Sequence, residues 1–408
     1  MSAIAAYRAL LRIVGPAYVL VAFLGRIPLA MSQLGVLVLV SQVTGRYGLG
    51  GAAAGVLAVA NAIGSPVAGS LADRRGQRPV VLVQSLLGAA GLVLVVVVTS
   101  EDAPAWSILA AAAFAGLTIP QVGPLARVRW RPLTADARDQ ERLVDAAFSY
   151  EGSADEASFV LGPALIGVLA IAASPSGALL AGAALLAVFG TWFALHPTAR
   201  VVEPHLGDSD VRPGPLWTSA FVVLVLAQLL MGSIFGSVQT GTTVLADAAG
   251  RAGEAGLVHA VLGIGSVVAG LAIAGLPEHV LYATRMLVSA CGLLVLSSPL
   301  LLVGSLASLV AVIAALGFAV APYMISNFAL AGVLVPIRRV GAAMTMLAGA
   351  TGIGYALGAA VAGRLADHAD HDAHHPAFAV TVTAATLAVL LALGAHRTLR
   401  DARPADPR

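Results

Sequence analysis

Charge is scarce in this chain, because Asp, Glu and Arg make up only 11% of its 408 residues, whereas a soluble domain carries roughly 25% charged residues. So few charges cannot cover a large water-facing surface, which excludes an ordinary soluble protein. Lysine is absent, so all 23 basic residues other than histidine are arginines. A phosphate-binding loop of the form G-x-x-x-x-G-K-[ST] is therefore absent too, and we expect no ATP-driven process within this chain.

Disulfides and the common enzyme motifs are missing as well. Cys291 is the only cysteine, which excludes an intramolecular disulfide. There is no H-E-x-x-H motif, and no nucleophile–base or metal-binding group lies within the apolar runs, so we expect neither an enzyme nor a cofactor. The loop 367–375 is rich in His and Asp. We interpret it as a solvated polar loop, with divalent-metal binding as the alternative.

Long apolar runs dominate what is present. A helix that crosses a bilayer needs roughly 20 mostly apolar residues, and the chain has twelve runs of at least about 18. The predicted spans are 15–42, 50–71, 79–99, 105–128, 145–172, 175–196, 216–245, 253–276, 284–303, 305–334, 341–363 and 376–395. The sequence therefore predicts an all-α membrane protein with twelve transmembrane helices.

One polar stretch divides these spans six and six. Residues 197–215 form the longest polar interruption within the array and contain several acids and prolines. We predict an N-terminal six-helix bundle over 1–196, a cytoplasmic linker over 197–215 and a C-terminal six-helix bundle over 216–408. The two bundles are expected to be pseudo-symmetric.

The arginines predict which side of the membrane each loop occupies. With the N-terminus inside, only Arg46, Arg251 and Arg364 fall on the outer side. The cytoplasmic segments then hold Arg8, Arg12, Arg74, Arg75, Arg78, Arg129, Arg131, Arg138, Arg142, Arg200, Arg212, Arg285, Arg338, Arg339, Arg397, Arg400, Arg403 and Arg408. This is a strong positive-inside bias. It predicts a multi-pass protein of the cell membrane with both termini in the cytoplasm, and the small net charge of +2 predicts no nucleic-acid partner.

The loop after the second span carries the most specific motif. It resembles the loop between the second and third helices of major facilitator superfamily transporters, which reads roughly G-x-L-a-D-r-x-G-r-[kr]. A glycine in such a place lets a neighbouring helix approach closely. The acid, Asp73, can pair with Arg78 or accept hydrogen bonds from a helix N-terminus, which makes a conformational latch. The matching residues are Gly69, Leu71, Asp73, Arg74, Gly76 and Arg78.

The fifth span carries a second, partial resemblance, to the superfamily's antiporter-associated signature g-x-x-x-G-P-x-x-G-G. Gly162, Pro163 and Gly167 match, whereas Ser158 and Ile166 depart from it. The proline is expected to kink the helix, and the glycines to allow tight packing. The likeness points to the drug/proton antiporter-type efflux members. In the superfamily this helix meets the eighth helix across the two halves, where a close contact would seal against proton leak.

Ionisable side chains inside the apolar runs form a candidate site. Arg26 lies roughly 18 Å into the first span at 1.5 Å per residue, and Glu151, Asp155 and Glu156 lie in the fifth. Such groups are costly in a bilayer and mark function. Because these helices are neighbours in the superfamily, Arg26 is expected to pair with Asp155 or Glu156. Movement of Arg26 would then load or release a proton. A static ion pair and direct binding of a charged substrate are the alternatives, and three acids against one arginine favour a proton or a cationic substrate.

Uncharged polar residues within the spans are predicted to line a central cavity. Their number is small and their neighbours are mostly Ala, Val and Leu, which suits an amphipathic organic molecule better than a sugar. For any one of them, a hydrogen bond between helices is the alternative. The predicted lining residues are Gln33, Asn61, Gln121, Gln228, Gln239, Tyr323, Asn327 and Tyr355.

The resemblance implies a secondary transporter that works by alternating access, with a small-molecule substrate, protons and the lipid bilayer as partners and a monomer as the expected state. The leading hypothesis is proton-coupled efflux of small amphipathic compounds. An importer or facilitator of a small metabolite, and a membrane receptor that moves no substrate, are the alternatives.

Overall fold

The computed structural model describes residues 2–101, 103–202, 214–251, 254–277, 279–369 and 372–401. Every regular element in these ranges is a helix. Twelve helices are long and apolar enough to cross a membrane, which confirms the predicted fold class. Most of the predicted linker, residues 203–213, lies outside the described residues.

The first six spans are built from eight α-helices. They are α1 (Ala3–Thr44), α2 (Tyr47–Arg75), α3 (Gln77–Ser100), α4 (Ala105–Thr118), α5 (Val122–Leu133), α6 (Gln140–Ala172), α7 (Pro175–Leu185) and α8 (Thr191–Leu195). Helices α4 and α5 share one span, and so do α7 and α8, which a wider turn over Leu186–Gly190 joins. A short 3₁₀ helix, Pro197–Val202, follows.

The last six spans follow the same antiparallel course. They are α9 (Ser219–Ala248), α10 (Ala255–Ile273), α11 (Tyr282–Ser297), α12 (Leu306–Leu334), α13 (Val340–Asp367) and α14 (His374–Asp401). Short 3₁₀ turns extend α11 over Ser298–Leu302 and precede α13 over Ile337–Arg339.

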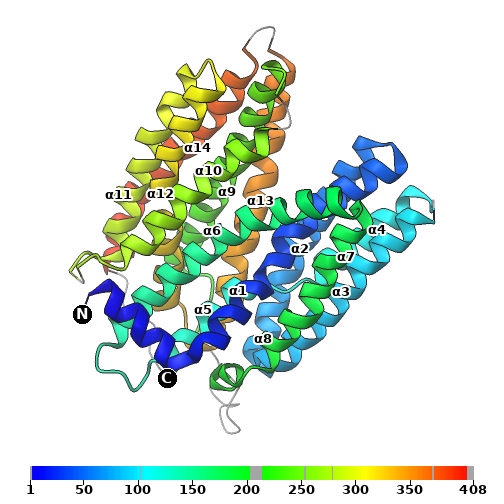
Figure 1. The fold of residues 1–408 in the computed structure, drawn as a ribbon. Helices are drawn as coiled ribbons and strands as arrows, with labels where there is room; N and C mark the ends of the chain where they lie inside the picture. Colours follow the sequence, from blue (N-terminus) through cyan, green and yellow to red (C-terminus); the bar gives the residue numbers. More distant parts are fainter. Residues whose placement is uncertain are drawn as a thin grey trace.

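The molecule has two halves, α1–α8 and α9–α14, each packed mainly within itself (Figure 1). Helix α1 begins and helix α14 ends at the same end of the molecule, which we call the terminal end, and the opposite end is the far end. The halves meet through α2 against α13 and α6 against α10, with smaller contacts of α5 with α13 and α6 with α12.

The first helix is broken at Gly15, whose φ of 76° and ψ of 161° lie outside the helical range. Glycine adopts this positive φ without the penalty that a Cβ would bring, and Pro16 follows it. The segment 3–14 is therefore separate from the spanning part of α1, in agreement with a predicted span that begins at residue 15. Ala6, Leu10 and Val14 are its buried side.

Candidate functional site

A cluster of buried charges lies near the middle of the spans in the N-terminal half. Arg26 on α1 reaches two acids on α6: its Nη2 is 2.5 Å from Glu151 Oε2 and its Nη1 is 3.0 Å from Asp155 Oδ1. The same guanidinium donates to the carbonyls of Ala22 and Glu151. Arg26 is 4% exposed and Glu151 is fully buried. The expected pairing of Arg26 with Asp155 is therefore present, and Glu151 joins it.

Helix α5 completes the cluster with two residues that the sequence argument missed. Arg127 Nη1 lies 2.8 Å from Asp155 Oδ2, and Trp130 Nε1 donates to Glu151 Oε1 at 2.7 Å. The guanidinium of Arg127 also stacks over the ring of Phe328 on α12, 4.3 Å from its centroid. Arg127 therefore touches an acid of one half and an aromatic ring of the other.

Glu156 differs from the other two acids. It is 7% exposed, yet no ion pair within 4.0 Å involves it among the described residues. Its side chain faces Ser266 on α10, across the contact between the halves. The expected alternative partner of Arg26 is thus directed away from Arg26.

Arg129 is a third buried arginine in this half, and it has no acid partner among the described residues. It donates to Gln77 Oε1, to the carbonyl of Phe193 and to Thr198 Oγ1, and its guanidinium lies 3.7 Å from the ring centre of Phe193. Beside it, just after α8, burial and the positive charge of Arg129 lower the pKa of His196.

Three buried arginines therefore stand against the three acids. They are Arg26, Arg127 and Arg129, against Glu151, Asp155 and Glu156. With Arg26 as the only arginine counted, the acids were in excess, and this excess favoured a cationic substrate. That count was incomplete, so the cluster by itself favours neither sign of substrate charge.

The Asp155 carboxylate lies against the start of α5. A Cβ on Gly123 would lie 2.3 Å from Asp155 Oδ1, so the carboxylate occupies space that only glycine leaves free. Gly123 is in the first turn of α5, where the helix dipole stabilises negative charge. Asp155 is thus held by two arginines and a helix N-terminus, and its side chain keeps 18% exposure.

The fourth span is broken between α4 and α5, and two residues that were predicted to line the cavity form hydrogen bonds at this break. Asn61 on α2 donates to the carbonyls of Gly116 and Ile119, both at 2.9 Å, which the interruption leaves without helical partners. Gln121 in turn donates to Asn61 Oδ1 at 2.7 Å. These contacts give both residues a role between helices of one half.

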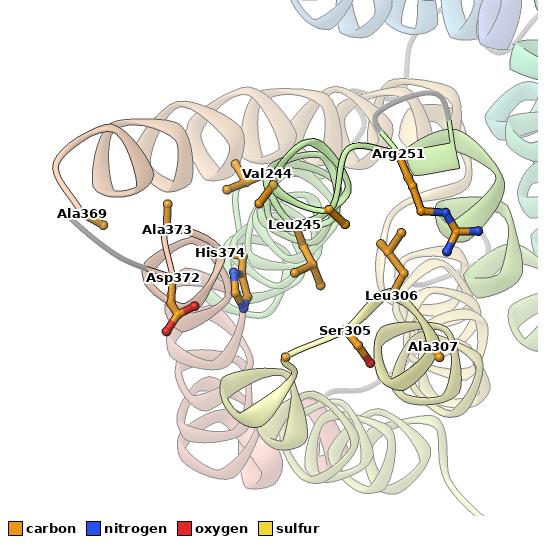
Figure 2. A pocket seen from close by; sticks show the side chains of 13 residues that line it. Val244, Leu245, Arg251, Ser305, Leu306, Ala307, Ala369, Asp372, Ala373 and His374 are labelled. Atoms are coloured by element: carbon orange, nitrogen blue, oxygen red, sulfur yellow. The ribbon is translucent and has the colours of Figure 1, made fainter.

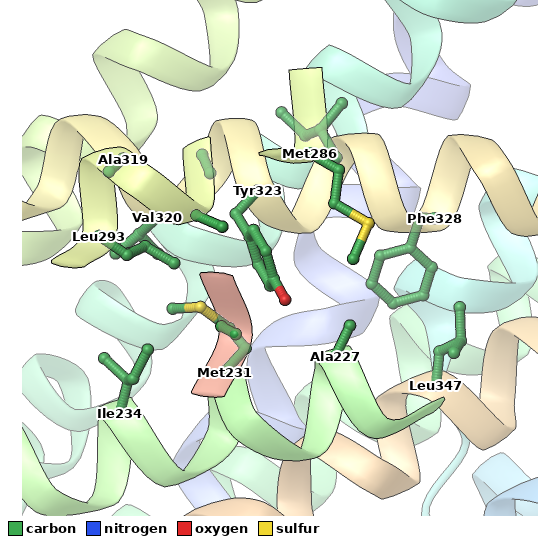
Figure 3. Close-up of a cluster of buried hydrophobic side chains, with 14 of the residues drawn as sticks. Ala227, Met231, Ile234, Met286, Leu293, Ala319, Val320, Tyr323, Phe328 and Leu347 are labelled. Atoms are coloured by element: carbon green, nitrogen blue, oxygen red, sulfur yellow. The ribbon is translucent and has the colours of Figure 1, made fainter. Parts of the chain in front are cut away.

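Three predicted lining residues of the other half are fully buried. Figure 3 shows Tyr323 on α12 directed into the apolar core among side chains such as Met231 and Met286, inside the C-terminal half. Asn327 donates to the carbonyl of Leu224 on α9, and Gln228 Oε1 accepts from Thr351. The Tyr323 hydroxyl, Asn327 Oδ1 and Gln228 Nε2 have no hydrogen-bond partner among the described residues.

The remaining predicted lining residues lie in the parts of the spans nearer the far end. Tyr355 on α13 donates to Gln239 Oε1 on α9 at 2.7 Å, and this pair is exposed. Gln33 on α1 is partly exposed. All three side chains keep some exposure, so they remain predicted lining residues.

The motif after α2 forms a contact between the halves at the terminal end. Asp73 accepts hydrogen bonds from the backbone N–H groups of Gly341 and Ala342, both at 2.8 Å, in the first turn of α13. Of the two expected partners, a helix N-terminus and Arg78, the helix is the one present. A Cβ on Gly69 would lie 2.1 Å from Thr345 Oγ1 and 2.6 Å from the Gly341 carbonyl, so Gly69 permits this approach.

The other motif residues shape the turn itself. Arg74 is in the last turn of α2, and Gly76 ends that helix with a φ of 85°. Leu71 packs against the buried cluster at the terminal end, and Arg78 is exposed.

Two further ties join the halves at the same end, and the sequence argument missed both. Asp145 on α6 binds Arg285 on α11 with both oxygens on Nη1, at 2.8 and 2.7 Å. Tyr7, in the segment before Gly15, donates to the carbonyl of Leu271 on α10 at 2.9 Å. Both residues of the ion pair are largely buried, although each lies close to the end of a predicted span.

Glycines on α10 determine how closely α6 and α10 approach. A Cβ on Gly270 would lie 2.4 Å from Ser153 Oγ, and one on Gly263 would lie 2.2 Å from Val160. The antiporter-like motif of α6 is not part of this contact. Gly162 instead meets Ala30 of α1 within the same half, and Gly167 has nothing within 4 Å. The close approach of α6 and α10 therefore depends on glycines of α10, and α6 continues through Pro163.

The halves separate toward the far end. On α2 the contacts with α13 reach Ala62, which lies against Gly349. Closer to the far end, a Cβ on Gly48 or on Gly363 would meet nothing within 4 Å. Figure 1 shows the two halves diverging in this direction. The buried charges lie near the level where the contact ends.

A cavity of about 600 Å³ lies at the far end of the C-terminal half, away from the charged cluster. Figure 2 shows Arg251, Asp372 and His374 around an apolar floor that includes Leu245 and Leu306. Part of the predicted His/Asp loop is here, although residues 370–371 lie outside the described ones. Within the described part of the chain no cluster of three metal-ligating side chains occurs, and His374 and His375 both bond the carbonyl of Val303.

Solved transporter structures share this fold along nearly the whole chain. The human organic anion transporter MFSD10 (TETRAN) matches with a TM-score of 0.71 and 19% identity, over 93% of this chain and 99% of that one. A bacterial homologue of the iron transporter ferroportin, in an outward-facing state, matches with a TM-score of 0.72 and 14% identity, over 92% and 98%. The fucose:proton symporter FucP of E. coli matches with 0.64 and 15%, over 94% and 98%.

At these identities the structural matches establish the fold alone, and no curated protein sequence matches the chain. A sequence model of a family supports a firmer assignment, because it matches most of the chain. The matched part includes the break between α4 and α5, the charged cluster and the Asp73 motif. That model, the Major Facilitator Superfamily, matches residues 19–302, and the chain therefore belongs to this superfamily of transporters.

Proposed function

We propose that this chain is a proton-coupled secondary transporter that exports small amphipathic compounds by alternating access. The observation that carries the proposal is the buried cluster of Arg26, Glu151, Asp155, Glu156 and Arg127 near the level where the two halves part. Ionisable groups are expensive in a bilayer, and in transporters they mark pathways of protons or ions.

The ties at the terminal end support alternating access. The hydrogen bonds from the start of α13 to Asp73 and the ion pair of Asp145 with Arg285 both join the halves at that end. Both are contacts between surfaces that must separate if the molecule opens there. With the predicted topology, in which the arginine-rich terminal end faces the cytoplasm, this form would be outward-facing with its cytoplasmic end closed.

The partly exposed polar residues support an amphipathic substrate. Gln33, Gln239 and Tyr355 offer few hydrogen bonds among mostly apolar side chains, whereas a sugar requires many donors and acceptors. With the buried Arg129 counted beside the cluster, three arginines match the three acids, so the charges do not require a cationic substrate, and compounds of either charge and neutral ones belong in the test.

The test uses inside-out vesicles that carry the wild type or the double variant Asp155→Asn/Glu156→Gln. An inside-acid gradient is imposed, and a pH-quenched dye is followed while ethidium, an amphipathic anion, a neutral amphipathic dye or a sugar is added. We expect proton release with one of the amphipathic compounds in the wild type and none in the variant.

The two alternative functions give different outcomes. A facilitator, or an importer without proton coupling, would equilibrate a labelled compound without moving protons, and a receptor would bind one without moving it. Equal proton release by wild type and variant would reject the cluster as the coupling site.

A further inference from the structure

We propose that Glu156 alone takes up and releases the transported proton, while Glu151 and Asp155 remain ionised as a fixed part of the cluster. This rests on the proposed function, since it names the residue through which that coupling occurs. The structure separates the three acids by what each oxygen contacts.

The two fixed acids have both oxygens occupied by cationic or N–H donors. Glu151 lies against Arg26 and Trp130, and Asp155 lies between Arg26 and Arg127, at 2.5 to 3.0 Å. A proton on either acid would leave a buried guanidinium without its counter-charge. Loss of one partner of a buried ion pair is strongly destabilising, so these acids are poor carriers.

Glu156 has no such partner. It follows Asp155 in the sequence and is rotated about 100° around the helix, which directs it to α10. There it faces the fully buried Ser266, whose hydroxyl has no hydrogen-bond partner besides Glu156 among the described residues. A carboxyl group buried beside a lone hydroxyl needs a proton or another small cation to neutralise it. The hydroxyl can donate to the carboxylate or accept from the acid.

The charged groups around Glu156 are few. Asp155 adjoins it on α6, and Arg127 on α5 is near without pairing to it. Between Ala260 and Ile273, α10 carries no ionisable residue, and Tyr323 is the only one on α12. Within Ala260–Ile273 and α12, Tyr323 is thus the only ionisable group that could compete with Glu156 as carrier.

The position of Glu156 gives it access to both ends in turn. The contact of α6 with α10 extends from the terminal end to the point where Val160 packs against Gly263. The backbone carbonyl of Glu156 also lies next to Gly263. Glu156 thus lies at the border between the closed part and the open part. Rocking of the halves would move this border past it, so that the carboxylate takes a proton from water on one side and returns it to water on the other.

The experiment follows carboxyl protonation directly and needs no substrate. The full chain is reconstituted in lipid, and infrared difference spectra between acid and alkaline pH record the C=O stretch of protonated carboxyl groups. We expect a titrating band in the wild type and in Asp155→Asn, its loss in Glu156→Gln and its return in Glu156→Asp. Ser266→Ala should shift the frequency of the band, because it removes the hydroxyl that faces the group.

A band that survives in Glu156→Gln and disappears in Asp155→Asn would overturn the inference. So would substrate-driven proton release by the Glu156→Gln variant in the vesicle assay, and in that case the proposed function would stand. If the wild type releases no protons with any of the four compounds, both proposals fail. A thermal unfolding curve like that of the wild type shows that each variant is folded.

Discussion

The space that holds the Asp155 carboxylate exists because residue 123 has no side chain. We expect Gly123→Ala to displace this carboxylate from Arg26 and Arg127, since the added Cβ would lie 2.3 Å from Oδ1. Overpacking of this kind costs about 1–3 kcal/mol, so the unfolding temperature in detergent and the transport rate should both fall. The matched control is Gly167→Ala, where a Cβ meets nothing within 4 Å. Equal stability of the two variants would contradict this account.

At the same scale, the sequence located some members of the cluster and not others. Arg26 and the acids of α6 stand out because they are isolated charges within apolar runs. Arg127 is near the end of its run, where arginines are common, and a straight helix would place it close to the membrane surface. The break before α5 and the extension of that helix to Leu133 place it inside. The same break explains why Asn61 donates to backbone carbonyls and Gln121 donates to the Asn61 side chain, so that both are used within the fold.

At the scale of elements, the sequence predicted all twelve spans, because apolar length is a direct signal. Most span ends agree to within about five residues, whereas α1 begins at Ala3, before the break at Gly15, and α14 continues to Asp401. Contacts between the halves were harder to predict, because they depend on which face of each helix turns inward. The latch of Asp73 was accessible through its motif. The tie of Asp145 to Arg285 joins charges 140 residues apart, and neither residue has a local pattern that indicates the other.

The segment before Gly15 is an element whose role can be tested separately. Tyr7→Phe removes its hydrogen bond to Leu271 on the other half. Hydrogen bonds between membrane helices contribute about 0.6–1.7 kcal/mol, so the variant should reduce the far-end-open population a few-fold. A spin-label pair at Gly48→Cys and Gly363→Cys, in a Cys291→Ser background, reports this opening as a distance distribution. Tyr150→Phe is the control, because its hydroxyl bonds Val19 within one half, and an equal shift there would reject the assignment.

At the scale of the whole molecule, the two charged ties at the terminal end act on one equilibrium between the far-end-open and far-end-closed forms. They share no residue and join different helix pairs, α2 with α13 and α6 with α11, so their contributions should add. Each tie is a hydrogen bond to a charged group, worth about 1.5–3 kcal/mol. Together they are large enough to set which form dominates.

We therefore expect Asp73→Asn and Asp145→Asn each to shorten the distance of the same far-end spin-label pair in part of the population, and the double variant to make the closed form predominant. The control is Glu141→Gln, which breaks an exposed pair with Arg131 at the same end but within one half. Such surface pairs contribute about 0–1 kcal/mol, and this one does not join the halves. If the double variant kept the wild-type distance distribution, the terminal-end ties would be packing contacts only, and the far end would be held open by the apolar contact of α6 with α10.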